Sequence, residues 1–496
     1  MSALIPATVA KKRLQPLPLH DIQKLVLQGY DLHRSRYFVL TVANAKLARQ
    51  FLTKLADEHW LTTAEHHRDH VAERLHGQQC PVSLGLTFKG LVALELNPRY
   101  QAVFKNKARA FAEGAHFRAA AHLADTGNNA AAFWKPEFQP DKAHVLLTLH
   151  ADTQQALAQT QKTLQDMAGS AFEMLGWHNA FEGQHLEETA PARKARRVHF
   201  GMLDGISQVR IHGATDKAGT HEPGELLLGH ANDEGFNAWR LATERPDLSG
   251  TSGLSAQAQS AKVASFFKNA SFCAFRPMRQ YVTAFQQFLD TQASEWDVSA
   301  EYLRAKLLGR WDNGQVIRTG ETSAPVAQAG RLDDFKFKDD PAGLGCPFGA
   351  HIRRMNPRDD GVVPTRRRPI VRRGMPYGPA WTPAEPNGTD LERGLLGLFF
   401  CASLEDQFEH LLSEWANANP MGVPNKGTAK DPLIGNHSQP HARFDIPQDM
   451  DHDPLALQGF TPFVRTEGTL YAFFPGLHGL HMMNDSEVFG PRACHD

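Results

Sequence analysis

The segment that offers the most chemistry is "GCPFGAHIRRMNPRDDGVVPTRRRPIVRRGMPYGP", from Gly345 to Pro379. It holds a single histidine, His351, among arginines and prolines, and its apolar residues have neither helical nor strand spacing. Pro347 and Pro357 stiffen the backbone on either side of that histidine. A neutral imidazole on a stiff backbone suits an axial ligand of a metal or a haem. The plain alternative is a polar loop residue, since the chain has 25 histidines.

Two other stretches offer charged groups. In "FGMLDGISQ", residues 200–208, Asp204 ends an apolar run and stands beside a glycine. Asp-Gly is a common turn dipeptide, and an acid/base group at the edge of a cavity is the alternative, which spacing does not decide. In "PIVRRGMPYGP", Arg372 and Arg373 follow two aliphatic residues. This pair is either a solvated surface or, if one side chain points inward, a fixed cation beside a bound ligand.

Other catalytic motifs are missing from the sequence. It contains no GxxxxGK[ST] phosphate loop, no GxSxG nucleophile elbow and no HExxH pair. The run "HHRDH", residues 66–70, fits a charged helix face better than a metal site. The residues by themselves therefore indicate an α+β protein with one unusual loop.

The elements that must position these residues alternate between strands and helices. Apolar runs typical of strands, each followed by a helical pattern except the last, occur at 36–44, 81–88, 144–151, 270–276, 394–402 and 468–476. The helical pattern after the third run covers residues 152–175, with Asp152 and Thr153 as its N-cap. Long irregular segments, 206–262 and 318–392, interrupt the alternation. Two α+β units, each an antiparallel sheet with helices on one face, therefore fit better than one doubly wound sheet.

The composition is that of a folded enzyme. The 496 residues carry a formal net charge of −1, which gives no reason to expect nucleic acid as a partner. The cysteines form no CxxC pair, and their odd number argues against a disulfide framework; they are Cys80, Cys273, Cys346, Cys401 and Cys494. The N-terminus lacks a signal-peptide pattern, and no apolar stretch approaches the ~18 residues of a membrane span. We therefore expect a cytoplasmic protein that has no membrane partner.

Taken together, these segments resemble the dye-decolorizing peroxidases, a family of haem enzymes. "CPFGAHIRRMNPR" is similar to the family's block around the proximal histidine, "IVRRGMPYGP" to its block around the distal arginine, and "MLDGISQ" to its GxxDG motif. The resemblance implies an α+β fold of two ferredoxin-like halves, each an antiparallel sheet with peripheral helices, and haem b between the sheets. We place the halves at residues 1–215, with the distal aspartate, and 216–496, with the proximal histidine and the distal arginine.

The resemblance also assigns roles to residues. His351 becomes the proximal iron ligand, Asp204 the distal acid/base, and Arg372 the distal arginine. The cofactor contacts that we expect are His351, Arg372, Ile206, Gln208 and Arg353. A carboxylate bonded to the His351 ring would raise its donor strength, and Glu405 in "SLEDQF" is our candidate, with a helix cap at the surface as the alternative role.

The implied activity is that of a haem peroxidase. Hydrogen peroxide would form compound I, and bulky dyes or phenolics would then supply electrons, with an optimum at acid pH. Tyr377 or Trp381 could carry electrons from donors too large for the haem edge, with aromatic packing as the alternative role. A haem-handling protein without turnover, such as a carrier, an iron-releasing protein or a sensor, is the other function left open. The Asp204 and Arg372 pair favours catalysis, and whether the chain forms a homo-oligomer stays open.

Overall fold

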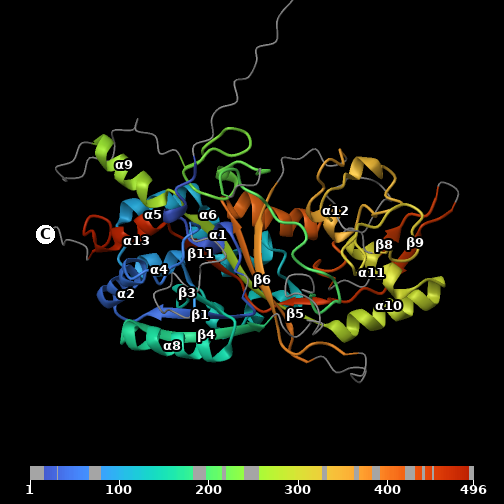
Figure 1. Ribbon diagram of the computed structural model, residues 1–496, viewed down its shortest axis with the longest axis horizontal. Coiled ribbons are helices and arrows are strands. Elements are labelled where there is room, and N and C mark those ends of the chain that lie inside the picture. The colour runs from blue at the N-terminus through green and yellow to red at the C-terminus, as the bar shows by residue number, and fades with distance from the viewer. Residues whose placement is uncertain are drawn as a thin grey trace, which may run out of the picture.

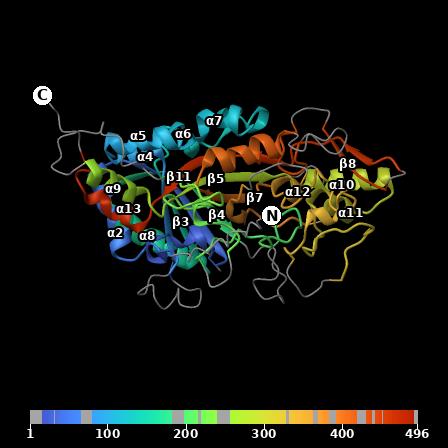
Figure 2. The same cartoon turned by 90° about the horizontal axis from the view of Figure 1, so that it is seen from above.

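The computed structural model describes residues 16–30, 32–65, 80–181, 197–214, 219–239, 256–326, 332–361, 368–382, 391–418, 430–437, 442–449 and 452–490. In these residues helices cover an antiparallel sheet, and Figure 2 shows α5, α6 and α7 along one side of the strands and α2 and α8 on the other. The predicted α+β class is therefore confirmed. No described helix is both long and apolar enough to cross a membrane.

The strands and helices have the following bounds. The strands are β1 (Arg34–Val42), β2 (Val82–Leu86), β3 (Val145–Ala151), β4 (Phe172–Phe181), β5 (Ser271–Gln280), β6 (Val371–Tyr377), β7 (Gly394–Cys401), β8 (Arg443–Ile446), β9 (Leu455–Gln458), β10 (Val464–Thr466) and β11 (Leu470–Phe474). The α-helices are α1 (Lys24–Leu27), α2 (Ala45–Asp57), α4 (Phe88–Ala93), α5 (Pro98–Lys107), α6 (Arg109–Glu113), α7 (Ala115–His122), α8 (Gln154–Ala168), α9 (Ala256–Phe267), α10 (Val282–Trp296), α11 (Ala300–Leu308), α12 (His351–Met355) and α13 (Leu477–His481).

The main sheet joins strands from both halves of the chain. Its order is β4-β1-β3-β2-β11-β5-β7-β6, and β10 also pairs with β5. The first four strands come from the N-terminal half and the others from the C-terminal half. The last strand of the chain, β11, lies between the groups, with Phe473 paired to Leu86. All five of its residues are buried, as expected for a central strand covered on both faces.

The sheet curls so that one face becomes an enclosed core. Tyr37 from β1 stacks on Phe275 from β5, with ring centroids 5.3 Å apart, although these strands are not neighbours in the sheet. His178 from β4 also meets Phe275, at 5.7 Å. The end strands β4 and β6 approach each other, but no ladder joins them in the described part of the chain. The architecture is therefore a strongly curved sheet that does not close into a barrel.

Two elements differ from the sequence-based expectation. The helix predicted over 152–175 ends at Ala168, because Gly169 has a φ of +54°, and β4 begins at Phe172. Its predicted N-cap is confirmed, since the Thr153 side chain accepts a hydrogen bond from the Ala156 N–H. The segment predicted to be irregular over 318–392 contains the strand β6. Because β6 is an edge strand, it tolerates Pro376, and its charged and glycine residues hide the alternating pattern.

The segment after β7 was predicted as a helix and forms two consecutive π-helical stretches. They are η9 (Leu404–Glu409) and η10 (Leu411–Ala416). π-Helical turns are rare and often occur at functional sites. The number of residues per turn in a π-helix differs from the 3.6 used in the prediction. The presence of a helix was therefore predicted correctly, but its type was not.

A second group of elements lies at one end of the molecule. Figure 1 shows α10, α11 and α12 together with β8 and β9 on the side away from α2 and α8. This group has its own core, in which Phe285, Phe288 and Phe463 pack together, and a smaller cluster around the fully buried Trp311. It carries His351 at the first residue of α12.

Candidate active site

His351 is held at the start of a short helix by the turn that precedes it. The carboxylate of Asp340 accepts hydrogen bonds from the backbone N–H groups of Gly345 and Cys346, at 3.2 and 2.8 Å. These bonds fix the backbone that leads into α12. The side chain of His351 is 22% exposed, so it is packed on one side and accessible on the other.

The His351 ring is oriented by a buried carboxylate. Its Nδ1 lies 2.8 Å from Oδ2 of Asp431, whose side chain is fully buried. The other oxygen of Asp431 accepts the backbone N–H groups of Leu433 and Ile434, at 2.9 and 3.0 Å. Burial raises the pKa of Asp431, but the adjacent imidazole and the hydrogen bonds outweigh this, so its pKa is lowered. An ionised carboxylate at Nδ1 places the proton on Nδ1 and the lone pair on Nε2.

Glu405, the predicted carboxylate partner, does not have this role. It lies on η9, and its Oε1 accepts a hydrogen bond from the backbone N–H of Ala110 at 2.5 Å. The prediction is therefore wrong, and Asp431 is the residue that sequence reasoning missed. Asp431 lies 80 positions from His351, and the sequence "DPLIGNH" around it shows only an acidic turn before a proline.

Arg353 was predicted to contact the cofactor, and its contacts contradict this. A guanidinium has five N–H donors, and all of those of Arg353 are used by the carboxylates of Asp360 and Asp340 and by the carbonyls of Asp340 and Cys346. Its side chain is fully buried. Arg353 therefore ties together the loop around α12 and leaves no donor for a ligand.

Arg354 has a similar structural role. Its Nε donates to the Trp415 carbonyl and its Nη2 to the Ala418 carbonyl, at the end of η10. Burial lowers its pKa to about 10, and the nearby Asp431 acts in the opposite direction. Arg353 and Arg354, which follow His351 closely, thus hold the loop in place.

The loop with Asp204 carries the predicted distal residues. Gly205 has a φ of +76°, a conformation that favours glycine, and the chain bends there. The Asp204 side chain is exposed and makes no hydrogen bond with the described residues. Ile206, two residues after Asp204, packs against Gly314, where a Cβ would lie only 2.6 Å from Cδ1 of Ile206. This contact positions the loop, and it leaves the carboxylate accessible.

The strand β6 brings two arginines to this loop. Nη2 of Arg372 donates to the Ser207 carbonyl at 2.6 Å. Nη1 of Arg373 lies 3.1 Å from Oε1 of Gln208, and its Nη2 donates to the Leu27 carbonyl at 2.9 Å. The structure therefore brings Arg372 to the Asp204 loop from 165 positions away. The predicted cofactor contact Gln208 has its side-chain oxygen engaged by Arg373.

The two aromatic candidates for electron transfer are packed into the protein. Tyr377 donates its hydroxyl proton to Glu467 at 2.9 Å, and burial raises its pKa. Trp381 is partly buried and packs against the core of α10 and its neighbours. These contacts agree with the alternative role of aromatic packing for both residues.

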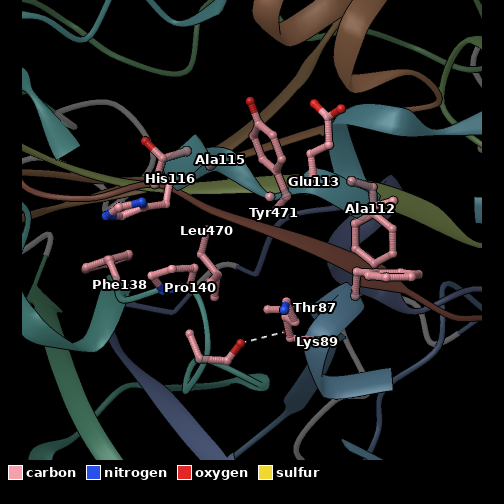
Figure 3. A pocket seen from close by; sticks show the side chains of 15 residues that line it. Thr87, Lys89, Ala112, Glu113, Ala115, His116, Phe138, Pro140, Leu470 and Tyr471 are labelled. Carbon is pink, nitrogen blue, oxygen red and sulfur yellow. Dashed lines mark hydrogen bonds between the residues drawn. The ribbon is translucent and has the colours of Figure 1, made fainter. Parts of the chain in front are cut away.

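A small cavity lies elsewhere in the molecule. Figure 3 shows it between Lys89, Glu113, His116, Phe138 and Tyr471. Its volume is about 40 Å³, which is room for water and too little for an aromatic substrate. Neither His351, Asp204 nor Arg372 lines it.

The donor set fits a haem. One histidine is enough to hold haem iron, because the porphyrin supplies the in-plane ligands. Nε2 of His351 makes no hydrogen bond with the described residues, and its lone pair is fixed by the bond from Nδ1 to Asp431. Proximal histidines with a carboxylate at the other nitrogen are strong donors. The curved α+β sheet and a histidine oriented by a buried carboxylate are therefore consistent with a histidine-ligated haem protein.

Comparison with known proteins identifies the family. Residues 21–180 match the family model described as "DyP dimeric alpha+beta barrel domain". The chain is 28% identical to a dye-decolorizing peroxidase of Mycetinis scorodonius, over 94% of this chain and 87% of that protein. It is 30% identical to the dye-decolorizing peroxidase of Auricularia auricula-judae, over 70% of this chain and 66% of that protein. A solved dye-decolorizing peroxidase in complex with 2,6-dimethoxyphenol superimposes with a TM-score of 0.74 at 25% identity, covering 94% of this chain and 98% of that one.

The chain belongs to the dye-decolorizing peroxidase family and is a peroxidase. The resemblance stated from the sequence is confirmed. The comparisons favour this function over the haem-handling alternative, because the relatives over most of the chain are named as peroxidases.

Proposed function

We propose that the chain binds haem b with His351 as the iron ligand and uses hydrogen peroxide to oxidise bulky dyes and phenolics. The observation that carries this proposal is the 2.8 Å contact between Nδ1 of His351 and the buried carboxylate of Asp431. It prepares Nε2 as a donor to iron. The phenol bound in the related solved structure supports phenolics as electron donors.

Each proposed site residue has its own role in the reaction with peroxide. When bound, the haem iron supplies the redox chemistry of peroxide cleavage. The Asp204 carboxylate takes the proton from the inner peroxide oxygen and returns it to the outer one. The Arg372 guanidinium stabilises the negative charge on the departing oxygen, an effect worth about 2–4 kcal/mol for a single donor of this kind. Ile206 and Gln208 hold the Asp204 loop in position for this transfer.

An acid optimum follows from the use of a carboxylate. Aspartate has an ordinary pKa of ~3.9, whereas histidine is protonated below about pH 6 and then no longer accepts a proton. A carboxylate base therefore keeps working in mild acid. We expect dye oxidation to be strongest at acid pH.

The remaining assignments are also proposals. A cytoplasmic location is supported by Cys80, Cys273, Cys346 and Cys401, which are all free and buried, while Cys494 lies outside the described residues. The division at residues 215 and 216 is supported by the grouping of the strands in the sheet. A homo-oligomer stays a prediction.

Substitution of the histidine tests the proposal. His351→Ala should yield protein with little bound haem or an altered Soret band. His452→Ala is the matched control, since His452 also bonds an aspartate through Nδ1, at 2.7 Å, but lies exposed on the surface. Full haem binding with an unchanged spectrum in His351→Ala would show that another residue is the ligand.

A further inference from the structure

A buried lysine holds the turn that leads to His351. Lys306 lies on α11, and its side chain is almost fully buried. Its Nζ donates to the carbonyls of Leu344 and Gly345, at 2.6 and 2.8 Å. The N–H groups of Gly345 and Cys346 are bound by Asp340 on the other side of the same turn. Both the donors and the acceptors of this turn are therefore fixed.

The same helix packs tightly against α12 at a second point. Gly309 ends α11 with a φ of +98°. A Cβ at this position would lie 2.5 Å from Cγ1 of Ile352 and 2.8 Å from Sγ of Cys346. Ile352 is the residue after His351, so a displacement of this turn relative to α11 would also displace the histidine.

The lysine is charged at neutral pH but close to losing its proton. Burial lowers the pKa of Lys306 to about 8, against the opposite effect of nearby acidic groups. Burial also raises the pKa of Cys346 to about 12, so this neighbour stays a neutral thiol. The titratable groups that face Lys306 or its neighbour Cys346 are Tyr302, Glu321, Asp340, Arg310 and Arg353.

We propose that Lys306 is a positioning residue for His351, because its ammonium group holds the Leu344–Gly345 turn that sets the position of α12. This inference rests on the proposed role of His351 as the iron ligand. Lys306 does not touch the reacting groups, so its effect is on where the imidazole lies. A charged donor binds two carbonyls more strongly than a neutral amine does, so the turn loosens when Lys306 loses its proton.

Hydrogen exchange of the full-length chain without haem tests the contact directly. Lys306→Met keeps the length of the side chain and removes the charge, and Lys306→Arg keeps a charge at every pH used. We expect Lys306→Met to speed amide exchange in residues 343–355 by at least tenfold, with strands β1 and β3 unchanged. Lys262→Met is the control, because Lys262 forms ion pairs with Asp485 and Glu487 at the surface. Wild-type exchange in this segment of Lys306→Met would overturn the proposal.

The ligation itself gives a second measurement. In the haem-loaded ferrous protein, the iron–histidine stretching band should shift in Lys306→Met and in the wild type between pH 7 and pH 9, but not in Lys306→Arg. Equal bands in all three proteins at both pH values would also overturn the proposal. If Lys306→Met does not fold, the proposal is still tested by comparing the iron–histidine band of the wild type with that of Lys306→Arg at pH 7 and pH 9. Absence of any iron–histidine band in the wild type would instead refute the role of His351, and the exchange measurement would still judge the Lys306 contact.

Discussion

The two sides of the proposed site are built in opposite ways. On the side of His351, Asp431 is fully buried and both of its oxygens are hydrogen-bonded. On the other side, Asp204 and Arg372 are exposed, and Asp204 has no hydrogen bond to the described residues. A histidine that binds iron must keep one orientation. A buried network in which every oxygen is hydrogen-bonded provides this. A proton carrier must change its protonation state easily, which an accessible carboxylate does.

The largest effect is expected from breaking the buried side. Asp431→Ala removes the partner of His351 and leaves the backbone N–H groups of Leu433 and Ile434 unpaired, so we expect a loss of about 2–6 kcal/mol in the free energy of unfolding, at about 1–3 kcal/mol for each buried donor. Haem affinity should also fall, by roughly 10- to 100-fold. Denaturant unfolding and haem titration measure the two effects. Asp449→Ala is the control, since Asp449 forms the same kind of pair with His452 at the surface, and it should change neither.

The exposed side should respond in rate and not in stability. Arg372→Leu should slow the reaction with peroxide by roughly 100- to 1000-fold, and Asp204→Asn by less, because water can partly replace a proton carrier. The free energy of unfolding should change by about 0.5 kcal/mol or less in either variant. Stopped-flow mixing with peroxide measures the rate, with the exposed pair Lys162→Leu and Asp166→Asn on α8 as controls. Wild-type rates in both site variants would remove Asp204 and Arg372 from the mechanism.

The pH dependence of stability should separate the two aspartates. The folded pKa of Asp431 is lowered, so its stabilising contribution is present above the ordinary aspartate pKa of 3.8 and is lost as the pH falls through the lower folded value. The thermal midpoint of the chain without haem should therefore fall below about pH 4. This fall should be smaller in Asp431→Asn and unchanged in Asp204→Asn. The same curve for all three proteins would contradict the contrast between the two sides.

The smallest effect is expected from the carboxylate that the sequence suggested. Glu405→Gln keeps an oxygen that can accept the Ala110 N–H, and burial already raises the pKa of Glu405 towards the neutral form. The Soret band should stay as in the wild type, and the thermal midpoint should move by no more than about 2 °C. A shift of the Soret band like that of Asp431→Asn would restore Glu405 as a partner of the histidine.

The sequence by itself determined six of the strands and the local motifs of the site. The strands β1, β2, β3, β5, β7 and β11 follow from apolar runs, because a buried strand needs apolar side chains whatever its partners are. The bend at Gly205 follows from the glycine that a positive φ requires. His351 and Arg372 were also recognised from the sequence, because they lie in motifs that match the family.

Only the tertiary structure decided which distant groups meet. Asp431 reaches His351 across 80 positions, and Arg372 reaches Ser207 across 165, and no local pattern encodes either contact. In the folded chain, Arg353 and Arg354 donate hydrogen bonds to carbonyl and carboxylate oxygens of nearby loops, while Arg372 is exposed on an edge strand. The side chains of these arginines are chemically identical, and only the family motif distinguished Arg372 from the others in the sequence. Burial and the positions of backbone acceptors, which exist only after folding, determine whether an arginine holds the loop or faces the site.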